Sequence, residues 1–335
     1  MLLSHPLAAL LLSQGAPGAQ SRRGRLAVSR KTMAGALGCG ALARRLVALS
    51  GSPGKRLRLL SWNVLADGLA QNGGFLRCPS AALEWAHRGP LIVRELLAAD
   101  ADILCLQEVN HFHELEASLA THGFAGAFQE KRNSPCVGLG APADGLALFW
   151  RTSRLTLQGP PQGVFFTDSR GEALSQCALL AHFQECEGRP LLVATTHLKA
   201  KAGEECAAIR LAEARQLRAL LEARSAPGAA VLCCGDFNTV LDSDPLRALL
   251  GMDAPSSLRL SAVVCPPAVD GAAYTTFKVR EAGVKEAAID HVLAAALRPV
   301  AAWAAPTRAA AGPDALPSNA FPSDHVPQVV DFSFD

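Results

Sequence analysis

The chain has 335 residues, half of them hydrophobic, with 32 Lys and Arg residues against 30 Asp and Glu residues. This composition excludes bulk disorder, which needs low hydrophobicity and high net charge, and the length suffices for one large core or two small ones. Apolar runs stop short of the ~18 residues that a membrane span needs, so we expect no crossing of a bilayer.

Residues 1–56 carry basic side chains but no acidic ones, and the first acidic residue is Asp67. Ten of the 32 basic residues precede Leu59, which leaves 22 basic and 30 acidic residues, a net charge of −8, for the remainder. An acid-free leader rich in Arg, Ser and Ala is typical of a mitochondrial transit peptide. A secretory signal, a basic nucleic-acid arm and a disordered tail without a destination are the alternatives. Initiation at Met33 would discard half of these basic residues and predicts an additional cytoplasmic form.

The globular region is predicted to run from residue 57 to residue 335, with short apolar runs alternating with stretches of helical periodicity. The runs that predict strands are Leu57–Trp62, Ile103–Leu106, Leu146–Trp150, Ala173–Phe183, Leu191–Thr196, Ala230–Cys234, Ala288–Leu293 and Val326–Phe332. Helices are predicted over Ser80–Ala99, Glu114–His122, Ala208–Ala223 and Pro245–Leu250, and a loop over Ala301–Ser318. Ser80 is predicted to cap its helix, with Glu84 near the N3 position. Strands outnumber helices, which favours α/β layers with mixed sheets over a doubly wound parallel sheet.

None of the ten cysteines forms a C-x-x-C pair, so we expect no structural zinc site. Cys105, Cys233 and Cys234 lie within apolar runs and are predicted to be buried thiols. Without a secretory signal, a reducing compartment fits this chain better than a disulfide framework.

At five places an apolar run ends and polar, chemically useful residues follow at once. These places are Ser61-Trp-Asn63, Leu106-Gln-Glu108, Thr196-His-Leu-Lys199, Gly235-Asp-Phe-Asn238 and Ser323-Asp-His325. Rigid strands commonly hold the site-building loops of α/β enzymes, and oxygen ligands of this kind suit Mg²⁺ or Mn²⁺. No nucleophilic Ser or Cys stands beside a base, so hydrolysis by an activated water fits better than covalent catalysis. Taken singly, Glu108 would be a cap or turn residue, Asp236–Asn238 an Asx-turn and His197 a packed histidine.

In this order the five motifs resemble the endonuclease/exonuclease/phosphatase superfamily and, within it, the deadenylase-like branch. The resemblance spans Leu57 to the C-terminus. Segments that carry it are Ser61–Ala66, Asp102–Val109, Asn133–Cys136, Thr196–Ala200, Tyr274–Lys278, Pro322–His325 and Asp331–Phe334. It implies a four-layer α/β sandwich, in which two mixed β-sheets pack face to face and are flanked by helices.

The resemblance also implies a role for each site residue. Glu108 would be the main metal ligand, Asn63 would lie near the same metal and the phosphate, and Asp324 would reach a second metal. Asp236 would orient or deprotonate the attacking water, and Asn238 would help to hold the phosphate. Phosphoryl transfer of this kind consists mostly of positioning and electrostatic stabilisation.

Two histidines would act on the phosphoryl group in the same scheme. His197 would donate to a phosphoryl oxygen, and His325 would stabilise charge on these oxygens while Asp290 fixed its tautomer and favoured its charged form. The cationic residues that would contact the substrate are Lys131, Lys199, Lys201 and Arg280. The chain departs from its relatives at His291, where they usually carry an aromatic residue, and at Lys201, where Arg is typical.

Two enzymatic activities follow from the resemblance. One is Mg²⁺-dependent removal of the 2′-phosphate of NADP⁺ and NADPH, giving NAD⁺ and NADH, and the other is 3′ exonucleolytic shortening of poly(A). A body of net charge −8 with 5% aromatic residues is unfavourable for tracking a polyanion, whereas a dinucleotide needs only a local basic pocket. No G-x-G-x-x-G follows a predicted strand, so NADP(H) would be a substrate rather than a bound cofactor. A non-catalytic nucleotide- or partner-binding protein is the alternative from another class, and the complete set of catalytic residue types argues against it.

Overall fold

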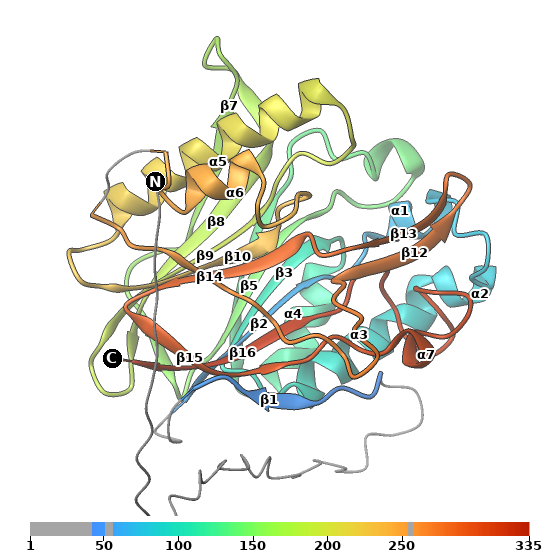
Figure 1. Ribbon diagram of the computed structural model, residues 1–335, viewed down its shortest axis with the longest axis horizontal. Helices are drawn as coiled ribbons and strands as arrows, with labels where there is room; N and C mark the ends of the chain where they lie inside the picture. Colours follow the sequence, from blue (N-terminus) through green and yellow to red (C-terminus); the bar gives the residue numbers. More distant parts are fainter. Residues whose placement is uncertain (1–41, 51–55, 254–256, 335) are drawn as a thin grey trace, which may run out of the picture. The chain divides into compact units, whose positions relative to one another are not determined.

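The computed structural model describes residues 42–50, 56–253 and 257–334, all of which belong to the compact unit that begins at Ala34. Two seven-stranded sheets, a separate two-stranded hairpin and the surrounding helices make up this part of the chain (Figure 1). No helix among these residues is long and apolar enough to cross a membrane.

The first sheet has the strand order β1-β15-β16-β2-β3-β5-β4. Strands β2 and β3 run parallel, and the other neighbouring pairs of this sheet are antiparallel. The bounds are β1 (Leu46–Ala48), β2 (Leu57–Asn63), β3 (Ile103–Val109), β4 (Phe124–Glu130), β5 (Gly145–Arg151), β15 (Leu297–Trp303) and β16 (Gln328–Phe334).

The second sheet has the order β11-β14-β10-β9-β8-β6, with β7 paired to β8. Its one parallel pair is β9 and β10. The bounds are β6 (Leu155–Leu157), β7 (Gln162–Thr167), β8 (Ala173–Glu185), β9 (Pro190–His197), β10 (Ala230–Asp236), β11 (Ser261–Val263) and β14 (Asp290–Ala295). The hairpin consists of β12 (Thr276–Arg280) and β13 (Gly283–Ala287).

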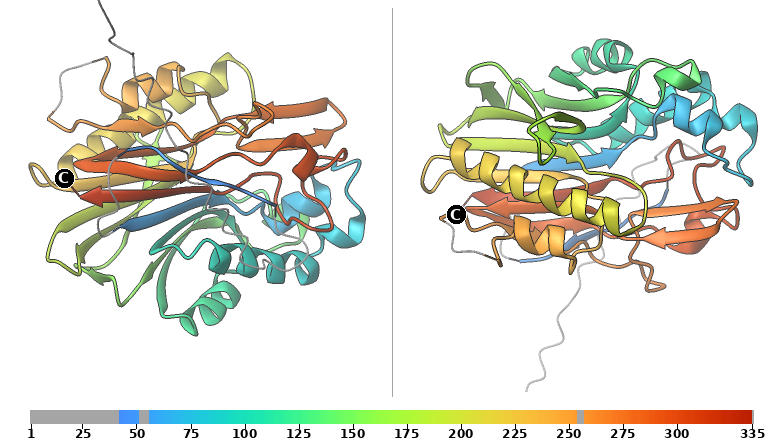
Figure 2. Two further views of the ribbon diagram at one scale, coloured as in Figure 1. Left: turned by 60° about the horizontal axis from the view of Figure 1, so that its bottom comes forward. Right: turned by 90° about the horizontal axis from the view of Figure 1, so that it is seen from above.

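Helices cover the outer face of each sheet (Figure 2). Helices α3 and α4 pack on the first sheet, and α5 and α6 pack on the second. The bounds are α1 (Asp67–Asn72), α2 (Ser80–Leu83), α3 (Trp85–Ala98), α4 (Phe112–Ala120), the 3₁₀ turn η1 (Val137–Leu139), α5 (Glu204–Arg224), α6 (Asp244–Leu249) and α7 (Arg308–Ala311).

Three apolar interfaces separate four layers. On β2, Leu57 and Leu59 pack between the two sheets, whereas Leu60 and Trp62 pack beneath the helices of the first sheet. Because both faces of the central strands are buried, these strands read as nearly continuous apolar runs in the sequence. The predicted four-layer α/β sandwich with mixed sheets is confirmed.

The three predicted buried thiols are confirmed as well. Cys105 and Cys234 lie in the core between the sheets, and Cys233 lies in the core beneath α5. Burial raises the pKa of each of the Cys105 and Cys233 thiols well above its ordinary value. No cysteine in the described ranges forms a disulfide.

The single helix predicted over Ser80–Ala99 is wrong. Glu84 takes an extended conformation with ψ 141° and divides the segment into α2 and α3. Its carbonyl accepts hydrogen bonds from the backbone N–H groups of His87 and Arg88, so Glu84 begins the second helix instead of completing a capping box on Ser80. The side chain of Ser80 makes no cap, because the residue before α2 is Pro79.

The loop predicted over Ala301–Ser318 also differs from the structure. Its first three residues complete β15, and Arg308–Ala311 forms α7, whose Thr307 side chain accepts from the N–H of Ala310. The other strands that sequence patterns missed lie mostly at sheet edges or in the hairpin, where one face meets solvent and no long apolar run is required.

The predicted domain start at residue 57 is too late. Residues 46–48 form β1, which pairs with β15 at the edge of the first sheet, and Leu42 is buried in the core beneath α3. Arg44 donates to Glu95 of α3 at 2.5 Å, with 5% and 1% of the two side chains exposed, and stacks over the Trp303 ring at 4.4 Å. The remaining leader, residues 1–41 and 51–55, lies outside the described residues, and its role as a transit peptide stays a prediction.

We expect a chain that begins at Leu57 to be less stable than the full chain by about 3–5 kcal/mol, because Glu95 would keep a buried charge without its Arg44 partner. Urea denaturation followed by tryptophan fluorescence measures the difference in the free energy of unfolding. A chain that begins at Ala41 retains β1 and Arg44 and is the matched control. Equal stability of the two shortened chains would contradict this account.

Candidate active site

The carboxyl ends of the two parallel strand pairs meet at one end of the sandwich. In the first sheet Asn63 ends β2 beside Gln107 of β3, and in the second sheet His197 ends β9 beside Asp236 of β10. The antiparallel strand β14 begins at the same place, because Asp290 pairs with Asp236. Four of the five sequence motifs therefore converge for a topological reason, since the strand ends that carry them lie together, whereas Ser323-Asp-His325 lies just before β16.

A β-bulge aims Glu108 at this place. The register between β3 and β5 shifts between Leu106 and Val109, and Glu108 has a φ of +59°, which is uncommon for a residue other than glycine. One carboxylate oxygen, Oε2, accepts from the N–H of Ala66 at 2.9 Å. Strain of this kind persists where the surrounding structure imposes it, commonly at functional sites.

Asn63 joins the two sheets at the centre of the site. Its Nδ2 donates to Glu108 Oε1 at 3.0 Å and to Asp236 Oδ2 at 3.1 Å, while its Oδ1 accepts from the N–H of Leu65 at 3.0 Å. His197 Nε2 lies 4.0 Å from the same oxygen of Glu108 and 3.7 Å from that of Asp236. Four of the predicted residues thus share one cluster.

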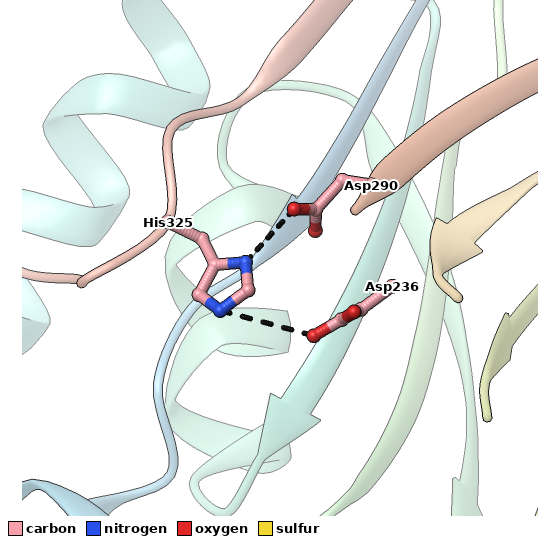
Figure 3. A group of neighbouring side chains, drawn as sticks. All are labelled: Asp236, Asp290 and His325. Atoms are coloured by element: carbon pink, nitrogen blue, oxygen red, sulfur yellow. Dashed lines mark hydrogen bonds and ion pairs between the residues drawn. The ribbon is translucent and has the colours of Figure 1, made fainter. Parts of the chain in front are cut away.

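His325 stands between two carboxylates (Figure 3). Its Nδ1 lies 2.9 Å from Asp290 Oδ2, and its Nε2 lies 3.8 Å from Asp236 Oδ2. Asp290 accepts from Thr275 Oγ1 at 2.5 Å through the same oxygen. The backbone of His325 is held as well, because Trp62 Nε1 donates to its carbonyl at 2.7 Å. The predicted His325–Asp290 contact is therefore present, with Nε2 facing the rest of the site.

Electrostatics favour a charged His325. Burial opposes the imidazolium, but Asp290, Asp324 and Asp236 outweigh burial and raise the pKa of His325 to about 9. Burial likewise opposes ionisation of Asp236, yet His325 and His197 lower the pKa of Asp236 below its usual value. Burial raises the pKa of Asp290. At neutral pH the site holds an imidazolium next to an ionised Asp236.

Asn238 occupies an Asx-turn within the site. Asp236 Oδ1 accepts from the N–H of Asn238 at 2.9 Å, and Asn238 has a φ of +51°. Its Nδ2 donates to the carbonyl of Leu198 at 3.1 Å. The turn and the functional interpretation are compatible, because the amide retains a second N–H and an oxygen for a ligand.

Asp324 is buried beside His325 but is engaged by cations. Lys278 Nζ donates to Asp324 Oδ2, and Arg280 Nη2 lies 3.6 Å from the same oxygen. Burial opposes its ionisation, but Lys278 and His325 hold the pKa of Asp324 well below its ordinary value. Lys278 had no role assigned from the sequence. A contact between Asp324 and a second metal stays a prediction.

The four predicted substrate contacts fall on two sides of the site. Lys131 and His197 line the same small pocket, with Lys131 Nζ 3.7 Å from Asp144. Lys199 follows His197 along the chain, and Lys201 is exposed in the left-handed region at φ +74°. Arg280 lies apart from these lysines on the β12–β13 hairpin, together with Lys278.

Buried charged residues of helices position the loops of the site, and sequence patterns missed them. On α5, Glu213 accepts from the N–H of Lys199 at 2.8 Å, and Arg210 donates to the carbonyls of Lys199 and Lys201 at 2.9 and 2.7 Å. On α3, the fully buried Arg88 donates to the carbonyls of residues 64, 65 and 322. In the sequence, a charged residue on the apolar face of a predicted helix is the pattern that could have indicated these buried residues.

His291 Nε2 donates to the carbonyl of Thr239 at 2.8 Å, and its ring packs 5.9 Å from that of Phe237. Burial lowers the pKa of His291. The imidazole therefore fills a buried aromatic position next to Asp290 without entering the catalytic cluster.

Oxygen donors at the site fit a hard divalent cation. Among the described residues, Asp236, Asp290 and His325 each offer a ligand atom within 4.8 Å of the others. The contact between Asp290 and His325 Nδ1 already uses two of these three groups. The carboxylate of Glu108 has lone pairs beyond its bonds to Asn63 and Ala66, so Glu108, with Asn63 beside it, could hold such a cation.

A model of the Endonuclease/Exonuclease/phosphatase family matches residues 60–325, which include every residue of the cluster described above. This chain belongs to that family. Its sequence is 36% identical over 293 residues to Nocturnin of Xenopus laevis, covering 84% of this chain and 73% of that protein. It is also 36% identical over 304 residues to Nocturnin of Drosophila melanogaster, but it spans only 47% of that protein's length.

The fold agrees with a solved structure of the same family. The human Nocturnin catalytic domain with a bound sulfate anion aligns with a TM-score of 0.66 and 28% sequence identity, over 87% of this chain and 98% of that domain. The resemblance drawn from the five motifs is therefore confirmed. Membership of the family makes this chain a phosphohydrolase or nuclease type of enzyme, and such enzymes generally depend on a divalent metal ion.

Proposed function

We propose that this enzyme is a divalent-metal-dependent phosphohydrolase that removes the 2′-phosphate of NADP⁺ and NADPH and releases NAD⁺ and NADH. The proposal rests on the pairing of a hydrolytic cluster with two separate cationic groups at its margin. Likeness to Nocturnin over most of the chain supports it. So does the sulfate in the related human domain, because sulfate is a tetrahedral anion like phosphate.

Each residue of the cluster has its own role in hydrolysis. Glu108 and Asn63 are the residues that would hold Mg²⁺ or Mn²⁺, which supplies positive charge to the phosphoryl oxygens when bound. Asp236 orients the attacking water and accepts its proton. His197 and the charged His325 donate to phosphoryl oxygens through Nε2, and Asp290 keeps His325 in that orientation. The bond between phosphorus and the ribose 2′-oxygen breaks, and the 2′-oxygen takes up a proton.

The distribution of charge favours a dinucleotide over poly(A) as the substrate. Residues 59–335 have a net charge of −8, so most of the body repels a polyanion. Positive charge is instead local, with Lys131, Lys199 and Lys201 on one side and Arg280 on the other. A dinucleotide carries few charges and meets both sides at once, whereas poly(A) binding gains from every phosphate that is neutralised.

Incubation of the full chain with Mg²⁺ and either NADPH or a 3′-adenylated RNA tests the proposal. We expect inorganic phosphate and NADH from the first substrate and an intact RNA from the second. Chromatography of the nucleotides and a sequencing gel measure both outcomes. RNA shortening without phosphate release would make the chain a deadenylase, and inertness toward both substrates would favour a nucleotide- or partner-binding protein.

A further inference from the structure

The β12–β13 hairpin lies apart from the two large sheets (Figure 1). Its two strands carry three cationic residues on one face. Lys278 and Arg280 are two residues apart on β12, so their side chains point to the same side. Lys285 of β13 pairs directly with Lys278 across the hairpin and shares that side. We call these three residues the hairpin cations.

The face that carries the hairpin cations is turned toward the catalytic cluster. Lys278 donates to Asp324, and Arg280 lies 3.6 Å from the same carboxylate. Lys285 is exposed to solvent on the same side of the hairpin, directly opposite Lys278.

The charges on this face are not balanced by the protein. Asp324 is the carboxylate in contact with Lys278 and Arg280, and no carboxylate in the described ranges lies within ion-pair distance of Lys285. Glu286, the acidic residue of β13, pairs with Arg308. Three positive charges around one negative charge leave an excess of two, and like charges directly opposite each other destabilise a hairpin. An anion bound at this face would relieve that repulsion.

We infer that Lys285, with Lys278 and Arg280, forms a second anion subsite beside the catalytic cluster, and that it takes phosphate groups of the substrate that are not hydrolysed. This inference rests on the proposed function for the identity of the ligand, which in NADP(H) is the diphosphate bridge. The bridge carries two negative charges, which match the excess of two positive charges. Lys285 is then a specificity residue that favours a dinucleotide over a mononucleotide.

Two substrates, one with the diphosphate and one without it, distinguish binding of the diphosphate by Lys285 from an effect on the scissile phosphate. NADPH carries both the scissile 2′-phosphate and the diphosphate, whereas adenosine 2′-monophosphate carries only the scissile group. In Lys285→Gln we expect the ratio of kcat/KM for NADPH to that for adenosine 2′-monophosphate to fall roughly fivefold, through KM. Lys285→Arg should restore the ratio, and Arg170→Gln, which removes an exposed charge from the β7–β8 loop, controls for net charge.

An equal loss for both substrates, or an unchanged ratio, would overturn the inference. A direct binding measurement keeps it testable whatever the enzyme hydrolyses. We expect isothermal titration with inorganic pyrophosphate in EDTA to show binding that is roughly fivefold weaker in Lys285→Gln than in the native chain. If NADPH is not a substrate but this difference is found, the proposed function fails while the subsite stands. If the two chains bind pyrophosphate alike, the subsite is absent.

Discussion

Glu108→Gln abolishes phosphate release while the protein stays folded. The substitution removes the negative charge that we place at the metal, and we expect kcat to fall at least about a thousandfold. Folding survives because the amide oxygen still accepts from the N–H of Ala66, which Glu108 contacts at 2.9 Å. Phosphate release at saturating Mg²⁺ or Mn²⁺ measures the loss, and circular dichroism with thermal unfolding checks the fold.

Glu114→Gln is the matched control for this substitution. Glu114 lies on α4, its side chain is exposed, and it is not part of the catalytic cluster. The same change of charge there should leave turnover at the native level. Metal-dependent activity retained in Glu108→Gln would remove Glu108 from the role of metal ligand, whereas loss of activity in both variants would indicate a general effect of charge.

Asp290→Asn lowers kcat by about a hundredfold to ten-thousandfold, because an amide no longer stabilises the charged form of His325 or imposes its tautomer. Asp290 is the largest of the influences that raise the pKa of His325 to about 9. Below that pH the native imidazole is charged, so activity that needs the charge is lost as the pH rises through about 9. Without Asp290 the pKa falls, and we expect the alkaline limb of kcat/KM to move to lower pH.

A pH profile of kcat/KM for both proteins measures this shift. The same linkage applies to stability, because the charged His325 stabilises the fold below its unfolded pKa of 6.5, and that contribution disappears as the pH rises through about 9. Asp314→Asn changes an exposed acid and serves as control. An alkaline limb that stays in place in Asp290→Asn would show that His325 is not the group that titrates.

Much of the fold could be predicted because its central strands are buried on both faces. Strands such as Leu57–Asn63 and Ala230–Asp236 have no solvent-facing side, so their sequences are continuous apolar runs that end sharply where the backbone leaves the sheet. The site residues follow those ends, which is why Asn63 and Asp236 were recognisable as neighbours in function. Edge strands such as β13 meet solvent and carry no comparable pattern.

Composition alone sets the amino-terminal boundary of the globular region too late. Arg44 counted there as one more basic residue of a leader, but in the fold it neutralises the buried Glu95. A single sequence contains no mark of such a pair, because the partners are 51 residues apart. The break at Glu84 also leaves no mark in the sequence. The helical periodicity continues across this residue, although its backbone is extended between α2 and α3.

The sequence by itself determined the chemistry of this protein: the types of side chain at the strand ends, their order along the chain, and the acidic character of the body. These follow from local pattern and from composition. Only the tertiary structure decided which charges face one another. It set Lys278 and Arg280 against Asp324, Lys285 opposite Lys278, and Arg210 and Glu213 beneath the loop of Lys199. The physical reason is that strand register and helix packing bring together residues whose separation in sequence carries no signal of contact.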